Sequence, residues 1–539
     1  MPRVRRLPPV RIAAPVDAVR AAAVEHLPTT SPTVGTVRVG VTDVALVGVG
    51  VDLDLAPDGP DATVVGFTPH GRLDVPFFRW AFRPLVAVSQ RRARRYAIAR
   101  LRAEFEGGPP AVPPKPVVGL PTATFTPEQA THIASAAAAV AVVSFASALV
   151  GQLGGPISNT FHASDTTLSN ALAITRLGAL IALVGIALAD RGGRRRSILI
   201  GVAGSAIVCG VSALSPNLVF FTGAQVLQRA FLIVTATVAS VAVVEEAPEG
   251  ARAYATSMLA LAGGFGFSFS VITLPIADLA AQAWRIPFVL GALTLFLVPT
   301  LARRLVETTR YTALVRTAVS RGRVRDIRRQ GYGRRFLLLA TIAFLLNMFN
   351  APSSQLTNKY LTDVHHFSNS GIALFRTVTT GIPGLVGLVL GGRLAEARGR
   401  RPIAAIALAV ATATQMAFFL GGGVLMWFMS GTSIIAASAG GIAIGTLGVE
   451  LFPTETRSTS NGLLGVVGVF GSALGFVVTG ALAHPQNEIG RAIALCGIAS
   501  LFAAIVLIPL LPESRAHELD DVSPTDARPP EEYGPRAHE

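Results

Sequence analysis

Stretches of apolar residues, each long enough to cross a bilayer, alternate with short polar segments from residue 130 to residue 511. A transmembrane helix needs about 20 consecutive apolar residues. The pattern predicts twelve such helices, numbered here from 1 to 12, at about residues 130–151, 168–189, 197–214, 218–244, 254–276, 286–302, 336–352, 371–394, 402–421, 424–448, 459–481 and 491–511. Six precede the polar segment in the middle of the chain and six follow it, which indicates two bundles.

The two predicted bundles repeat short polar motifs in the same order. Residues 188–195 recur at 394–401, which lie 206 positions later. The pattern Glu-x-x-Pro-x-x-x-Arg at residues 245–252 recurs at 450–457. Internal repeats of apolar segments are typical of secondary transporters, whose substrate site lies where the repeated bundles meet.

The first 106 residues follow a different pattern. Alternating apolar residues and turn residues predict strands and one short helix, at residues 10–13, 15–26, 37–41, 49–55 and 62–67. A long helix with an aromatic start and many arginines is predicted at 76–106. This basic helix has two interpretations: it lies on anionic lipid, or it packs across a small sheet with its arginines in water. The order strand, helix, strands, long helix resembles a reduced helix-grip (polyketide cyclase/START-like) domain.

Prolines separate this extension from the first bundle. Six of them lie between residues 107 and 126 and predict a semi-rigid linker. Thr126, Pro127 and Gln129 together form a helix start signal with a capping box. The predicted segments are an α+β extension, a linker, an N-terminal bundle, a basic loop, a C-terminal bundle and a tail, at residues 1–106, 107–127, 128–302, 303–335, 336–512 and 513–539.

Arginine is distributed unequally between the two sides of the predicted bundles. The segments before helices 3, 5, 7, 9 and 11 are rich in arginine, whereas the alternate loops hold little beyond Arg285, Lys359 and Arg491. Cytoplasmic loops of membrane proteins carry an excess of Lys and Arg. We therefore predict a multi-pass protein of the cell's plasma (inner) membrane with both termini in the cytoplasm. No apolar segment of a signal peptide follows the basic first residues.

The composition agrees with a membrane protein and excludes several other classes. Hydrophobic residues make up 51% of the chain and charged residues 14%, against about 25% charged in soluble proteins. The net charge of +14 follows from the topology, so no nucleic-acid partner is expected. With no Walker motif, catalytic constellation or metal-ligand spacing, we expect neither an enzyme nor a cofactor. Cys209 and Cys496 lie inside predicted helices as packing residues.

The polar loop motifs resemble those of the major facilitator superfamily over about residues 128–515. Its signature G-x-L-A-D-R-x-G-R-R matches residues 186–195, with Ile in place of the first Gly, and again 392–401. The Glu-x-x-Pro-x-x-x-Arg pattern, with residues 284–288 and 512–514, is similar to the sugar-porter and metabolite–proton symporter branches. This resemblance implies an all-α membrane protein of twelve helices in two repeats, beside a small α+β cytoplasmic extension, working as a monomeric transport unit.

The charged residues of these motifs predict a latch between the cytoplasmic ends of the bundles. A carboxylate at the end of helix 2 can face the N-terminus of a helix from the other half. Arginines of the same loop can reach glutamates at the end of helix 4, and we expect these pairs to hold the outward-open state. The predicted gating residues are Asp190, Arg194, Arg195, Glu245, Arg252, Glu396, Arg400, Arg401, Glu450 and Arg457.

Arg176 in helix 2 and Arg229 in helix 4 lie inside apolar stretches that contain no interior Asp or Glu. Because a charge inside the membrane is costly, it indicates function. The two arginines can bind an anionic substrate, pair with backbone carbonyls or face water. The predicted substrate-binding residues are Arg176, Arg229, Asn170, Gln225, Gln228, Asn347 and Asn350. Each amide can instead serve a helix–helix hydrogen bond. Arg376, nearer the outer surface, is expected to snorkel.

The sequence therefore predicts an alternating-access transporter of a small organic solute, anionic and carboxylate-like. Two alternatives are efflux of drugs, amphiphiles or lipids, and a membrane sensor that signals through the extension. Proton-coupled relatives commonly carry a carboxylate in helix 1, and residues 132–149 hold none. We thus expect facilitated diffusion, or co-transport in which the substrate carries the proton. His132 is expected at the surface, and Asp165 in water at the outer end of helix 2.

Overall fold

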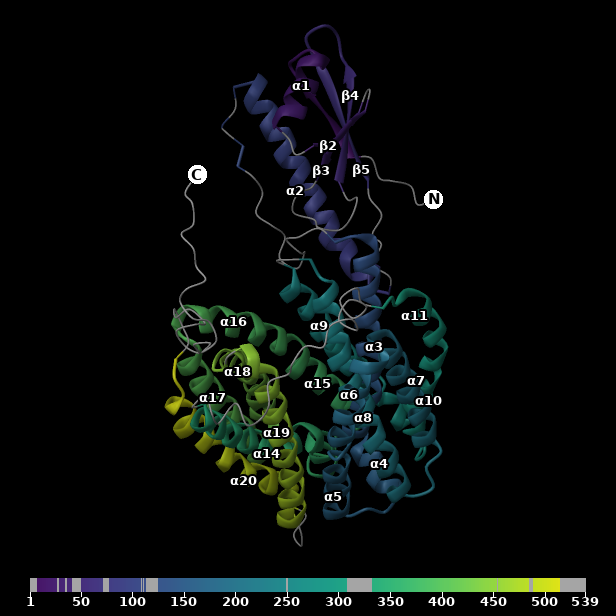
Figure 1. Cartoon of the computed structure of the whole chain (residues 1–539), viewed down its shortest axis with the longest axis vertical. Helices are drawn as coiled ribbons and strands as arrows, with labels where there is room; N and C mark the ends of the chain where they lie inside the picture. Colours follow the sequence, from purple (N-terminus) through teal and green to yellow (C-terminus); the bar gives the residue numbers. More distant parts are fainter. Residues whose placement is uncertain are drawn as a thin grey trace.

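The computed structural model in Figure 1 describes most of the chain. The described residues are 7–26, 29–33, 36–40, 50–70, 77–107, 109, 111–112, 125–248, 251–307, 332–452, 454–483 and 488–513. Most of the predicted linker, the basic middle loop and the tail lie outside these ranges, and the predicted division of the chain into six segments stays a prediction.

The N-terminal extension is an antiparallel five-stranded sheet with two helices (Figure 1). Its elements are β1 (Leu7–Ile12), α1 (Val16–His26), β2 (Thr29–Thr33), β3 (Thr36–Gly40), β4 (Gly50–Pro57), β5 (Thr63–His70) and α2 (Arg79–Phe105). The strand order is β1-β5-β4-β3-β2. The apolar pattern missed β2, which contains Pro32 and lies at the edge of the sheet, where proline is tolerated.

The two ends of α2 contact different parts of the molecule. Its second half packs Leu101 against the core of the sheet, and the Arg94 guanidinium lies over the Phe67 ring, 5.1 Å from its centroid. Its aromatic start reaches the membrane helices, where the Trp80 and Phe265 ring centroids are 6.0 Å apart. The prediction that the basic helix packs across a small sheet is confirmed, and its contact with anionic lipid stays a prediction.

Twelve helices among the described residues are long and apolar enough to cross a membrane. The first half contains α3 (Pro127–Gln152), the short α4 (Gly154–Thr160), α5 (Asp165–Thr175), α6 (Gly178–Gly192), α7 (Arg194–Ala213), α8 (Leu218–Glu246), α9 (Arg252–Ile272), η1 (Leu274–Asp278), α10 (Arg285–Leu293), η2 (Thr294–Leu297) and α11 (Val298–Arg304). The second half contains α14 (Gly333–Asp363), α15 (Asn369–Arg376), η3 (Thr377–Gly381), α16 (Ile382–Arg398), α17 (Arg400–Leu420), α18 (Gly423–Glu450), α19 (Thr454–Ala483), α20 (Ile489–Phe502), η4 (Ala503–Leu507) and η5 (Ile508–Leu510). The predicted fold class is confirmed.

The membrane helices begin and end close to the predicted limits, with one exception. The capping box is present, because Thr126 Oγ1 accepts from the Gln129 N–H at 3.2 Å and Gln129 Oε1 accepts from the Thr126 N–H at 3.0 Å. Helix 7 was expected to end near residue 352, whereas α14 runs on to Asp363 with Pro352 inside it. Transmembrane helices tolerate proline, since neighbouring groups satisfy the freed backbone.

Helices 2 and 8, which correspond in the two repeats, are both interrupted. Helix 2 consists of α5 and α6, and the turn between them uses i→i−3 backbone hydrogen bonds from Arg176 and Leu177. Helix 8 contains the π-helical stretch η3 between α15 and α16. Interrupted helices at matching positions point to the binding site of a transporter, and π-helical turns often occur at functional sites.

The N-terminal extension lies at one end of the membrane bundles (Figure 1). We call this end the domain side and the opposite end the far side. At the domain side Phe77 packs on the bundle, with the Arg304 guanidinium carbon 5.3 Å from its ring centroid. His132 is buried there, 4% exposed, and its Nδ1 accepts from the Val306 N–H at 3.4 Å. The expectation that His132 lies at the surface is wrong.

Candidate functional site

Arg176 lies at the interruption of helix 2, where it is only 5% exposed. Two residues later, Gly178 approaches α8 very closely. A Cβ atom at this glycine would lie 2.2 Å from the Val226 carbonyl oxygen and 2.8 Å from Cβ of Arg229. The missing side chain at position 178 therefore lets the turn after α5 lie directly against α8 beside Arg229, and the two arginines predicted for the site share one region.

The guanidinium groups of Arg176 and Arg229 repel each other, and the described residues do not neutralise them. The Nε atoms of both side chains are buried without a hydrogen-bond partner in this part of the structure. The Arg176 guanidinium instead lies over the ring of Phe476, with 5.0 Å between its central carbon and the ring centroid. Phe476 is fully buried and belongs to α19 of the second half. A cation–π contact uses the face of the guanidinium, so its in-plane N–H groups remain for a ligand.

The two predicted glutamines of helix 4 form helix–helix hydrogen bonds. Gln225 Nε2 donates to Ser212 Oγ at 2.8 Å, and Gln228 Nε2 donates to Ser205 Oγ at 2.7 Å. Both serines lie on α7 in the same half. Gln228 Oε1 is buried and has no partner among the described residues, and its role in substrate binding stays a prediction.

The three predicted asparagines do not gather around the arginines through hydrogen bonds. Asn347 donates to the Ala343 carbonyl of its own helix at 2.8 Å. Asn170 on α5 and Asn350 on α14 are exposed. Their role in substrate binding stays a prediction.

Arg376 is a third buried arginine, and the expectation that it snorkels is wrong. It is 9% exposed and donates from Nε to Asn358 Oδ1 at 2.8 Å and from Nη2 to the Ser354 carbonyl at 3.1 Å. Asn358 in turn donates to Gln152 Oε1 of α3 at 2.7 Å. Arg376 thus connects helix 8 to helix 7 and, through Asn358, to the first half.

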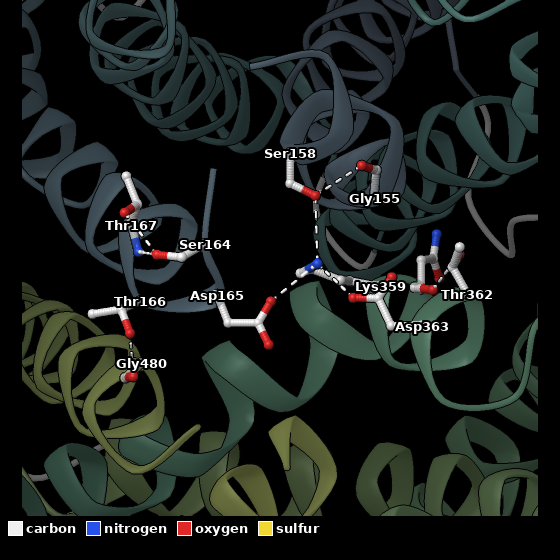
Figure 2. Close-up of polar contacts among 11 residues, drawn as sticks. Gly155, Ser158, Ser164, Asp165, Thr166, Thr167, Lys359, Thr362, Asp363 and Gly480 are labelled. Carbon is white, nitrogen blue, oxygen red and sulfur yellow. Dashed lines mark hydrogen bonds and ion pairs between the residues drawn. The ribbon is translucent and has the colours of Figure 1, made fainter. Parts of the chain in front are cut away.

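Lys359 forms a cluster of charges between the two halves, which the sequence analysis missed because it placed this residue in a loop (Figure 2). Its Nζ lies 3.0 Å from Asp165 Oδ1 at the start of α5 and 2.5 Å from Asp363 Oδ2, one turn further along α14. It also donates to Ser158 Oγ at 3.4 Å. The side chains of Lys359 and Asp165 are 6% and 16% exposed, so the expectation that Asp165 lies in water is wrong.

Two further contacts join the halves on the far side. The Asp278 carboxylate accepts from the backbone N–H groups of Asn369 at 3.0 Å and Ser370 at 2.8 Å. These residues begin α15, where a negative charge is favourable. Thr166 Oγ1 donates to the Gly480 carbonyl of α19 at 2.8 Å. Together with the Lys359 cluster, these contacts close the far side between the halves.

Arg194 and Arg195, two of the predicted gating residues, bind within the first half. Arg194 Nη2 donates to Glu245 Oε1 at 3.2 Å, and this is the expected contact between an arginine before helix 3 and a glutamate at the end of helix 4. The same expectation is wrong for Arg195, which donates to the carbonyls of Leu305 at 2.8 Å and Ala302 at 2.7 Å. Arg195 therefore ties the start of helix 3 to the end of helix 6.

Carboxylates that were not assigned to the latch occupy the starts of helices 3 and 9. Glu307 accepts from the Arg194 N–H at 2.8 Å. Glu513, in the equivalent position of the second repeat, accepts from the N–H groups of Arg400 at 3.0 Å and Arg401 at 3.1 Å. Each of these two helix N-termini thus has a negative charge from its own half. The predicted contact of the helix 2 carboxylate with a helix N-terminus of the other half stays a prediction.

The latch between the halves on the domain side stays a prediction. Arg252 Nε is buried without a partner among the described residues, and Arg401 Nη1 donates to the Leu511 carbonyl at 3.2 Å. The remaining gating residues have side chains outside the described part of the structure; they are Asp190, Glu396, Glu450 and Arg457.

Comparisons with known proteins agree with this architecture. A family model described as Major Facilitator Superfamily matches residues 136–449. The structure is similar to a bacterial homologue of the human lysosomal transporter Spinster, described as inward-facing and occupied, with 19% identity, 72% of this chain and 95% of that one covered, and a TM-score of 0.56.

Two other solved structures are similar to the chain. The xylose transporter XylE from E. coli, partially occluded and inward open, shares 16% identity over 72% of this chain and 99% of that one, with a TM-score of 0.57. A mutant of the nucleoside transporter NupG shares 14% identity over 70% of this chain and 100% of that one, with a TM-score of 0.58. At these identities the likeness shows the fold. No curated protein sequence matches the chain.

Proposed function

Because the chain belongs to the Major Facilitator Superfamily, whose members are transporters, we propose that it moves a small organic anion across a membrane by alternating access. The observation that carries this proposal is the pair Arg176 and Arg229. Both guanidinium groups lie inside the membrane bundles, repel each other, and have no acidic partner in the described part of the chain.

The chemistry of the pair favours a carboxylate. An uncompensated pair of buried positive charges is costly, and a bound anion removes this cost. A guanidinium presents a planar fork of donors that fits a carboxylate with two parallel hydrogen bonds. Arg176 lies at the interruption of helix 2 and contacts Phe476 of the other half, so the anion would bind where the two repeats meet.

The far-side contacts indicate which state this is. Asp165, Thr166 and Asp278 of the first half all bind residues of the second half on that side. Two similar structures are described as inward-facing or inward open. We take the far side to be the outer side, because the arginines at the start of α7 and the end of α11 lie on the domain side, and cytoplasmic ends of membrane proteins carry an excess of arginine. The protein would then reside in the plasma membrane with the anion site accessible from within.

A binding and uptake experiment tests the proposal. The purified full chain in proteoliposomes is offered a panel of labelled monocarboxylates, dicarboxylates, sugars and neutral amphiphiles. We expect a carboxylate to bind and exchange, and Arg176→Gln and Arg229→Gln each to weaken its binding by about tenfold or more, since hydrogen bonds to charged groups contribute about 1.5–3 kcal/mol.

The matched control is Arg303→Gln, which removes an exposed arginine at the end of α11 and should leave affinity unchanged. Unaltered carboxylate binding in both site variants would rule out the anion site. Transport of a neutral amphiphile that is indifferent to both arginines would favour the efflux alternative.

A further inference from the structure

The two pieces of helix 2 pack against different halves of the molecule. α6 packs mainly against α8 of its own half, whereas α5 packs mainly against α19 of the other half. We propose that α5 moves as a separate gate for the far side, latched by the ion pair between Asp165 and Lys359 and hinged at the turn of Arg176 and Leu177. This proposal does not depend on which solute the arginines bind.

In this latch, Asp165 can separate from Lys359 without leaving the lysine unpaired. Its ammonium contacts two carboxylates, and only Asp165 belongs to the first half. Asp363 lies one turn further along the same helix as Lys359 and moves with it. Removing one partner of a buried pair is costly because the other charge stays unpaired. Since Lys359 keeps Asp363 when Asp165 leaves, opening avoids this cost on the side of the lysine.

Part of the surface on which α5 closes, around Gly480, is made of small side chains. A Cβ atom at Gly480 of α19 would lie 2.9 Å from Cβ of Ser169 and 3.2 Å from Cα of Thr166. The hydrogen bond from Thr166 to the Gly480 carbonyl lies in the same contact. Because Ser169, Thr166 and Gly480 are small, no long side chain has to move for α5 and α19 to separate at this point.

The proposed hinge lies between α5, which moves, and α6, which stays packed on α8. α6 is held on α8 by glycines, since a Cβ at Gly178 would meet the Val226 carbonyl at 2.2 Å and one at Gly185 would meet Val234 Cγ2 at 2.6 Å. Just before this anchored piece, the Arg176 and Leu177 N–H groups form i→i−3 bonds in place of the α-helical pattern. A turn of this kind in the middle of a helix is typical of a hinge.

Distances between spin labels test the latch in the full chain. Labels replace Thr167 of α5 and Val364 after α14, both exposed, and the buried native cysteines are replaced by alanine. Pulsed electron resonance in liposomes should give one dominant short distance. We expect Asp165→Asn to raise the population with a longer distance several-fold, and the exchange Asp165→Lys with Lys359→Asp to restore the short one.

The matched control is Asp363→Asn, which removes the carboxylate that does not cross between the halves. It should leave the short distance dominant. No shift with Asp165→Asn, or a shift that the charge exchange does not reverse, would overturn the latch.

A second pair of labels tests the hinge separately. Thr167 and Leu214, the exposed residue at the end of α7, both lie on the far side of the first half. If α5 swings on its hinge, their distance changes whenever the distance from Thr167 to Val364 changes. A constant distance within the first half, together with a changing distance across the halves, would show that the whole half moves as one body and would overturn the hinge.

Discussion

At Arg176 a positive charge lies on an aromatic ring inside the membrane bundles. The ring belongs to Phe476 of the second half, so a residue of the proposed anion site also joins the two repeats. Desolvated cation–π contacts contribute about 2 kcal/mol. Phe476 thus holds the arginine without using the N–H groups that an anion needs.

We expect Phe476→Leu to weaken anion binding by roughly 5- to 30-fold, which corresponds to about 1–2 kcal/mol for the lost cation–π contact. Phe476→Tyr keeps the ring and should bind within about twofold of the parent. Isothermal titration with the carboxylate identified in the panel measures both. Equal affinities for the leucine and tyrosine variants would show that the ring does not position Arg176.

Single residues of the site differ in how far the sequence could predict them. Arg176 and Arg229 are visible because an arginine inside an apolar stretch is rare. Lys359 is not visible, because Pro352 and the polar residues after it suggest that helix 7 has ended. Its position in α14 depends on contacts with Asp165 and Ser158 of the other half, which no local pattern contains.

At the scale of an element, the starts of α7 and α17 show how each repeat turns from one membrane helix into the next. A single glycine separates α6 from α7 and α16 from α17; these are Gly193, with φ of 97°, and Gly399, with φ of 101°. The carboxylates of Glu307 and Glu513 then cap the new helix. A side chain at either glycine would be strained and would meet the capping carboxylate.

Gly193→Ala should destabilise the protein by about 1–3 kcal/mol, the usual cost of a strained backbone conformation. A Cβ there would also lie 2.5 Å from Glu307 Oε2. Gly192→Ala is the matched control, because a Cβ at this neighbouring position meets nothing within 4 Å. Thermal unfolding in detergent should show a lower midpoint for the first variant alone. Equal midpoints would contradict the role of the positive φ.

The membrane helices could be predicted from the sequence, because contact with lipid requires long apolar segments. Length and apolar character predicted all twelve spans, because a single segment in a bilayer can pair all its backbone N–H and C=O groups only as a helix. The interruption of helix 2 was not predictable, because it lies beside a close approach of Gly178 to α8, a tertiary contact that no local pattern contains. The strand β2 was missed because it contains Pro32, which argues against a strand unless the strand lies at a sheet edge. Which strand lies at the edge depends on the order of strands in the folded sheet, not on the local sequence.

At the scale of the whole molecule, charges are distributed differently on the two sides of the bundles. On the domain side, the described pairs such as Arg194 with Glu245 lie within one half. On the far side, Asp165 and Asp278 bind across the halves. Among the described side chains of the spans, the carboxylates stand at helix ends, including Asp165 in the cluster between the halves, and none is hydrogen-bonded to Arg176 or Arg229.

We therefore expect an imposed pH step to drive accumulation only of an anion that itself takes up a proton. In proteoliposomes, a weak carboxylic acid should accumulate with the gradient, and a sulfonate of the same size, which stays ionised, should only equilibrate. Concentrative uptake of the sulfonate under the same pH step would require a proton-carrying residue in the protein and would contradict this expectation.

The continuous helix α2 is a rigid rod that connects the membrane bundle to the sheet domain. Its 27 residues extend about 40 Å at 1.5 Å per residue. One end lies against α9 through Trp80, and the other is embedded in the sheet domain through Leu101. A tilt of about 10° at the foot would displace the sheet end by roughly 7 Å, as the geometry of a rod of that length requires. A small tilt of a membrane helix would thus become a large displacement of the sheet domain outside the membrane. A donor and acceptor dye, one on the sheet domain and one on the bundle, could record this displacement during single transport cycles.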